Sequence, residues 1–239
     1  MSGSREVQFW EIFENMSDEI SEFLNVTGFG IHSHPYDHHC LNPYNLWASI
    51  NDAALSWASQ LADFLDVEPV ITAVSGVGLD SAYGNKPWEY YRDNANPFDT
   101  DQPWDYSRET PPVAIVILIG PNDCGSTNDN ECPDDFDERY GETLVHYTSL
   151  YSSDVPVISV IGGSSSGYND ALVSAVSKAT QGYNGDGNVY EILLSKDVWD
   201  EINDHKNGNN GCFGHYNEKG HGMVAEDLAP KLREILDKN

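Results

Sequence analysis

The chain has 239 residues, of which 39 are acidic and only 12 basic, and its formal net charge is −27. Such a surface repels phosphate backbones and anionic lipid headgroups, so the composition argues against nucleic acid and membranes as partners. The length suits one α/β domain, and neither a transmembrane run of apolar residues nor a hydrophobic signal core is expected from the sequence.

The spacing of apolar residues predicts an alternation of helices and strands. Residues 6–24 have apolar side chains at helical spacing, which predicts an amphipathic helix in an N-terminal extension (1–24) to a single domain (25–239). Within that domain we expect strands near 24–31, 69–75, 113–119, 155–161 and 188–194, helices at 51–65, 138–152, 168–180 and 223–236, and a long irregular stretch at 79–111.

Strand–helix alternation of this kind is typical of a parallel sheet with helices on both faces. The predicted fold class is therefore α/β, a three-layer α/β/α sandwich with a five-stranded parallel sheet in the flavodoxin-like arrangement. In such sheets, ligands bind outside the carboxyl ends of the strands.

The strand predicted at 113–119 is the most informative element. Its continuous apolar run, followed by Gly120-Pro121-Asn122-Asp123, is typical of a parallel strand buried on both faces. Asn122 would stand at the carboxyl edge of the sheet, where its side-chain amide can donate a hydrogen bond to developing negative charge. Near the other end of the chain, His215 stands in a loop just before the closing helix, a position that suits a catalytic base.

The Gly-x-Asn-Asp block at 120–123 and the His-Tyr-Asn-Glu-Lys-Gly-His block at 215–221 resemble the third and last blocks of the SGNH (GDSL-like) hydrolase superfamily. The strand that ends in Ser75-Gly76-Val77-Gly78 looks like the second block. This turn, the helix-like segment 53–65 before it and Cys212, three residues before His215, are similar to carbohydrate esterase family 2.

The resemblance implies a serine esterase that hydrolyses small acyl esters, in particular O-acetyl groups on carbohydrate, without a cofactor. It assigns the nucleophile to Ser33, the base to His215, and the oxyanion hole to Asn122 and a backbone N–H at Gly76 or Gly78. Aromatic side chains between residues 88 and 106 would stack on sugar rings.

Two positions depart from the family pattern. The family's Gly-Asp-Ser is absent, and Ile31-His32-Ser33 stands in its place. Cys212 occupies the position of the usual aspartate, which favours a Ser–His dyad, although Asp204 is near enough in sequence to orient the imidazole.

Three alternatives stay open. The first is a non-catalytic SGNH-fold protein that binds glycan or a metal ion, with His32, His34, His38 and His39 as candidate ligands. The second is an α/β-hydrolase with Ser165 as nucleophile, because residues 163–167 match G-x-S-x-G between a predicted strand and helix. The third concerns the acidic loop 123–137, which contains oxygen ligands suited to calcium but lacks EF-hand spacing.

The four cysteines allow three pairings, and the sequence selects none of them. Cys124 and Cys132 bracket a short loop and can bridge in an oxidising compartment, and Cys40 and Cys212 can also pair. Acid and tryptophan enrichment, with glycosylation sequons at 15–17 and 25–27, favours a secreted protein.

Overall fold

The computed structural model describes residues 6–11, 53–73, 77–80, 87–92, 94–96, 99–103, 105–106, 111–125, 131–162, 169–185, 188–204 and 216–238. Five parallel strands form the central sheet in the order β2-β1-β5-β6-β7. Their bounds are Glu6–Glu11 for β1, Glu68–Ala73 for β2, Ala114–Leu118 for β5, Val157–Ile161 for β6 and Val189–Leu193 for β7. This is the flavodoxin-like order, so the predicted parallel α/β sheet is confirmed.

Strand β1 corrects the prediction for the N-terminal part of the chain. Its residues pair with both neighbours, Val7 lying opposite Pro69 of β2 and Ala114 of β5. The helix predicted over 6–24 is therefore wrong for residues 6–11. The first strand of the described sheet is β1 and not residues 24–31, so Ile31-His32-Ser33 does not directly follow that first strand. The six residues of β1 include Val, Phe and Trp, which are also common in strands. A window this short cannot distinguish helical periodicity from strand periodicity. Residues 24–31 lie outside the described part of the chain.

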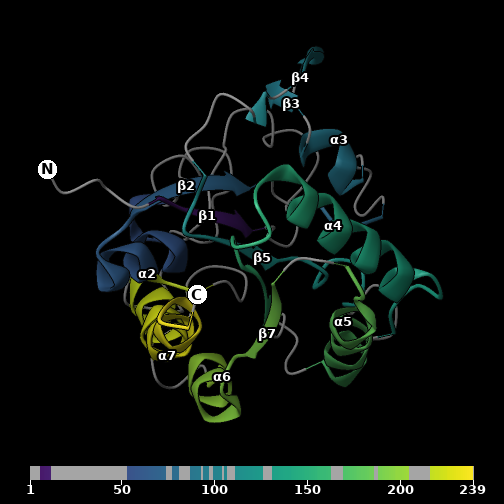
Figure 1. Cartoon of the computed structure of the whole chain (residues 1–239). Helices are drawn as coiled ribbons and strands as arrows, with labels where there is room; N and C mark the ends of the chain where they lie inside the picture. Colours follow the sequence, from purple (N-terminus) through teal and green to yellow (C-terminus); the bar gives the residue numbers. More distant parts are fainter. Residues whose placement is uncertain are drawn as a thin grey trace, which may run out of the picture.

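Helices cover both faces of the sheet (Figure 1). On one face lie α2 (Trp57–Leu65), α6 (Lys196–Asn203) and α7 (Glu218–Leu236), and on the other lie α4 (Phe136–Leu150) and α5 (Asp170–Gly182). A short 3-10 turn, Ala53–Leu55, precedes α2. The helices predicted at 138–152 and 168–180 are confirmed within two residues. The helix predicted at 51–65 is confirmed with its end at Leu65, but α2 begins only at Trp57. Helix α6 was not predicted.

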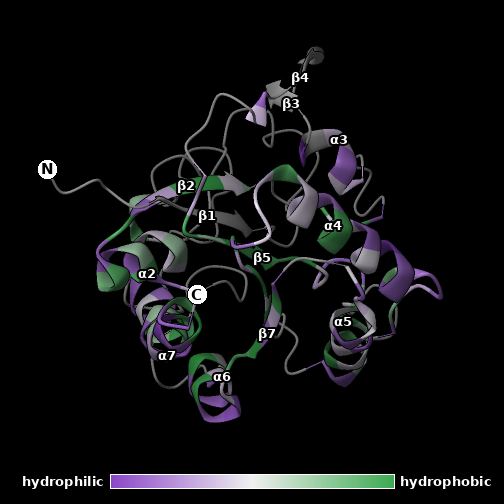
Figure 2. Cartoon of the chain, in the orientation of Figure 1, coloured by the Kyte–Doolittle hydropathy of each residue, from purple (hydrophilic) through white to green (hydrophobic). Residues whose placement is uncertain are grey.

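The two hydrophobic cores follow from the strand periodicity of two. On β5, Val116 packs with α2 and α7, whereas Ile115 and Ile117 pack with α4 and α5, and all three are fully buried. Figure 2 shows the same layering: β5 is coloured as hydrophobic, and α6 is hydrophobic toward the sheet and hydrophilic on its far side. Strand β5 is therefore buried on both faces, as its apolar run predicted.

The stretch expected to be irregular, 79–111, contains regular structure. It holds α3 (Trp88–Arg92) and an antiparallel pair formed by β3 (Asn94–Asn96) and β4 (Asp99–Pro103), which lie above the sheet in Figure 1. Among the helices of the described ranges, none has the length and hydropathy needed to span a bilayer.

Candidate active site

The turn that follows β5 places the Gly-x-Asn-Asp block at the carboxyl edge of the sheet. Gly120 has a φ of 117°, and a Cβ there would lie 2.8 Å from Cζ of Phe136. Glycine is thus required both by backbone conformation and by space. The Gly120 carbonyl accepts hydrogen bonds from the N–H groups of Asp123 and Cys124, at 3.0 and 2.9 Å, which closes the turn.

Asn122 connects this turn to the segment that follows β2. Its side chain is 2% exposed, and Nδ2 donates a hydrogen bond of 3.0 Å to the Val77 carbonyl. Because a primary amide has two N–H bonds, this contact is compatible with a second one from the same nitrogen. The structure therefore brings the second and third sequence blocks together at one point of the sheet edge.

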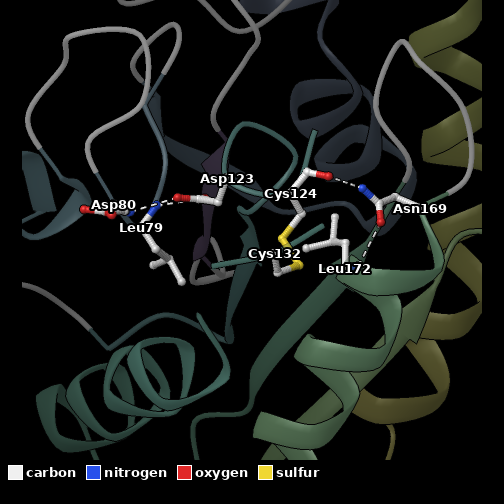
Figure 3. The surroundings of a disulfide bond; sticks show 7 residues. All are labelled: Leu79, Asp80, Asp123, Cys124, Cys132, Asn169 and Leu172. Carbon is white, nitrogen blue, oxygen red and sulfur yellow. Dashed lines mark hydrogen bonds between the residues drawn. A yellow bond between two sulfur atoms is a disulfide. The ribbon is translucent and has the colours of Figure 1, made fainter. Parts of the chain in front are cut away.

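Asp123 binds the same segment through its carboxylate. Its Oδ2 accepts from the N–H of Leu79 at 3.0 Å and its Oδ1 from the N–H of Asp80 at 2.8 Å (Figure 3). Burial raises the pKa of Asp123 to about 6, although the two N–H donors and the charge of Arg139 act in the opposite direction. Gly78 faces this carboxylate so closely that an added Cβ would lie 2.7 Å from Cγ of Asp123.

Arg139 of α4 holds the outer side of the segment. Its guanidinium donates to the Leu79 carbonyl, and it forms ion pairs with Asp80 at 3.1 Å and with Glu89 of α3 at 3.3 Å. Burial opposes the positive charge, but the contacts with the two carboxylates outweigh it, so the pKa of Arg139 is raised. The arginine thus joins α4, α3 and the segment after β2.

A disulfide follows directly after Asp123. Cys124 is bonded to Cys132, which confirms one of the pairs left open by the sequence. The Cys124 carbonyl accepts from Nδ2 of Asn169, whose Oδ1 in turn caps α5 by accepting from the N–H of Leu172 at 3.0 Å (Figure 3). The turn that carries Asn122 is therefore tied to α5 as well. Cys40 and Cys212 lie outside the described residues.

His221, the second histidine of the last block, has a structural position. It is fully buried in the first turns of α7, and Nδ1 accepts a hydrogen bond of 3.2 Å from the N–H of Trp57 at the start of α2. Its ring also makes an edge contact with Tyr216. In the described structure His221 therefore connects the start of α7 to the start of α2.

Several predicted residues lie outside the described part of the chain. They are Ser33, His215, Gly76, Ser165 and the four candidate metal ligands His32, His34, His38 and His39. Within the described ranges there is no group of three or more His, Cys, Asp or Glu side chains arranged for a metal ion. Of the candidate orienting groups for His215, Asp204 is an exposed residue at the end of α6.

Sequence reasoning missed Asp123 and Arg139 as parts of the site. Asp123 is adjacent to Asn122 in the Gly-x-Asn-Asp block, but its role depends on N–H groups more than forty residues earlier in the chain. Arg139 is one of only 12 basic residues and stands in the acidic run Asp134–Glu142, where an isolated positive charge is a recognisable signal.

Comparison with known proteins identifies the fold. No protein-family model matches the sequence, and no curated protein matches it significantly. Solved structures do match. A family two carbohydrate esterase from Clostridium thermocellum, in complex with cellohexaose, superposes with a TM-score of 0.68 and 21% identity over 98% of this chain. The acetyl xylan esterase Est2A from Butyrivibrio proteoclasticus gives a TM-score of 0.65 with 16% identity over 98% of this chain.

A protein described as a GDSL-like lipase from Bacteroides uniformis matches over 98% of this chain and 97% of its own, with a TM-score of 0.56 and 11% identity. By contrast, this chain spans 65% of the Clostridium esterase and 64% of Est2A. The chain therefore shares the α/β fold of these proteins, which include family two carbohydrate esterases and a GDSL-like lipase.

Proposed function

We propose that the protein hydrolyses small acyl esters, with O-acetylated carbohydrate as the substrate class. The observation that carries the proposal is the position of Asn122. It lies buried at the carboxyl edge of β5 and is hydrogen-bonded to the segment after β2, where the resemblance assigns the second oxyanion donor. The SGNH-type fold and the structural matches to carbohydrate esterases support this reading.

In the proposed reaction, His215 takes the proton of Ser33 as the serine oxygen attacks the ester carbonyl. The carbonyl oxygen becomes an oxyanion that accepts from Nδ2 of Asn122 and from the N–H of Gly76 or Gly78. Collapse breaks the bond to the leaving alcohol, which receives the proton from His215. Water, deprotonated by the same histidine, then releases the acid and restores the serine.

Turnover of an acetyl ester by the wild type and by Asn122→Ala tests the proposal. Loss of one oxyanion donor typically lowers kcat about 10²- to 10³-fold. We expect a loss in that range with little change in KM, because the donor acts mainly in the transition state. An effect confined to KM would show that Asn122 binds substrate instead. A wild type without turnover on acetylated sugars would reject the esterase.

A second candidate is a carbohydrate-binding protein without catalysis. The sequence favours it at one point, because the family's Gly-Asp-Ser is absent from the chain. One matched structure, with a TM-score of 0.70, is of a carbohydrate esterase whose active site has divergent catalytic and non-catalytic binding functions. Calorimetric binding of cellohexaose by a wild type that hydrolyses no acetyl ester would establish this candidate.

The α/β-hydrolase alternative with Ser165 has less support, since the matched structures are of SGNH type. We retain secretion as part of the proposal. The Cys124–Cys132 disulfide supports it, because such bonds persist in oxidising compartments.

A further inference from the structure

The segment of residues 77–80, here called the 77–80 loop, is held by hydrogen bonds from two sides. On the inner side, Asn122 donates to the Val77 carbonyl and Asp123 accepts from the N–H groups of Leu79 and Asp80. Both inner residues belong to the turn after β5. The loop and that turn thus form one hydrogen-bonded unit at the sheet edge.

On the outer side, two elements hold the loop. The N–H of Trp88, at the start of α3, donates to the Gly78 carbonyl at 3.0 Å. Arg139 of α4 donates to the Leu79 carbonyl and pairs with Asp80 and Glu89. The backbone of Leu79 is consequently bound at both its N–H and its carbonyl, by Asp123 and Arg139 respectively.

We propose that Arg139 is a positioning residue for the oxyanion hole, which acts by fixing the 77–80 loop against the turn that carries Asn122. This inference rests on the proposed function, because the loop follows the sequence block to which the second oxyanion donor is assigned. Arg139 touches no reacting atom. Its guanidinium meets a carbonyl and two carboxylates in different directions, a geometry that the planar fork of arginine provides and a lysine ammonium does not.

The ion pairs themselves contribute little to stability. The side chain of Asp80 is 59% exposed and that of Glu89 is 36% exposed, and pairs this accessible are weakened by solvent. The consequence of losing Arg139 should therefore appear mainly in the geometry of the loop. Oxyanion donors work because they are already in place, and a misplacement of about 1 Å can cost about 10²-fold in rate.

The test compares Arg139→Gln and Arg139→Lys with a matched control, Lys178→Gln. Lys178 of α5 forms an ion pair of 2.6 Å with Asp137 of α4. The control substitution therefore also removes the basic partner of an ion pair in this helical layer. In the described structure, Lys178 makes no contact with the 77–80 loop. For each protein, kcat and KM on an acetyl ester are measured together with hydrogen exchange of the Leu79 and Asp80 amides.

For Arg139→Gln we expect kcat to fall about 10- to 100-fold with KM nearly unchanged. The two amides should exchange about 10-fold faster than in the wild type, because the loop opens more often. Arg139→Lys should retain an intermediate kcat, and Lys178→Gln should match the wild type in both measurements.

Equal kcat and equal exchange in Arg139→Gln and Lys178→Gln would overturn the proposal. Faster exchange with an unchanged kcat would also overturn it, since Arg139 would then hold the loop without serving the reaction. If the wild type hydrolyses no acetyl ester, the proposed function fails, and the exchange measurement by itself decides whether Arg139 holds the loop.

Discussion

Asp123 provides the sharpest test of the hydrogen-bonded unit around Asn122, because its burial makes a quantitative prediction about pH. Burial in the folded protein raises the pKa of this carboxyl from its usual value of 3.8 to about 6. The native state therefore holds the proton more tightly than the unfolded chain. The stabilisation that results is fully present below pH 3.8 and is lost as the pH rises through about 6.

The size of this effect follows from the shift. One pKa unit corresponds to about 1.4 kcal/mol, so a shift of about two units changes the free energy of unfolding by about 3 kcal/mol between pH 4 and pH 8. The residue is buried, and solvent screening therefore does not reduce the figure substantially. Other carboxylates titrate in the same range, but they are common to the wild type and to a variant that lacks only Asp123.

Urea unfolding of the wild type and Asp123→Asn across that pH range isolates the contribution. The free energy of unfolding of the wild type minus that of the variant should rise by about 3 kcal/mol as the pH falls from 8 to 4. Asp137→Asn is the control. A hydrogen bond from Lys178 lowers the pKa of Asp137 below its usual value of 3.8, so its stabilisation is lost only below that pH and its difference should stay nearly constant from pH 8 to pH 4. If the wild-type minus Asp123→Asn difference in the free energy of unfolding stayed constant or fell as the pH was lowered, the pKa of Asp123 would not be raised in the folded protein.

The remaining predictions concern stability, measured by denaturant unfolding. Gly78→Ala should lower the free energy of unfolding by about 1–3 kcal/mol, because the alanine Cβ would displace the hydrogen-bonded carboxylate of Asp123. Unchanged stability would show that this carboxylate moves freely. His221→Ala should lower the free energy of unfolding by about 3 kcal/mol, because it leaves a cavity and removes the acceptor for the Trp57 N–H. Unchanged stability would contradict the structural role of His221. Asn169→Ala should cost about 1 kcal/mol through loss of the α5 cap, whereas a gain in stability would mean that the cap is unimportant.

The sequence predicted the parts of the fold whose cause is local. The apolar run of β5 and the turn after it lie within eleven consecutive residues, so both the strand and the place of Asn122 could be predicted. β1 could not, since the choice between strand and helix for its six residues is made by pairing with β2 and β5. The early start of α7 was missed because Gly220 and Gly222 weaken helix propensity, whereas Asn217 caps the helix by accepting from the Gly220 N–H at 3.0 Å.

The hydrogen-bonded unit at the candidate site was not predictable for a different reason. Whether Asp123 is solvated or buried depends on the backbone N–H groups that β2 brings beside it, and these are separated from it by more than forty residues. Arg139 acts across three elements in the same way. Spacing along the chain identified the block that holds Asn122, but only the tertiary arrangement shows what fixes that block.

The central proposal is that the chain is a serine esterase with Ser33 as the nucleophile and His215 as its base. Labelling with a serine-directed phosphonate, followed by mass spectrometry of the modified peptide, tests it most directly. The account predicts a label on Ser33 that forms more slowly in His215→Ala, because the histidine removes the serine proton. A label on Ser165 or another serine, or no label on a protein that hydrolyses acetyl esters, would contradict it.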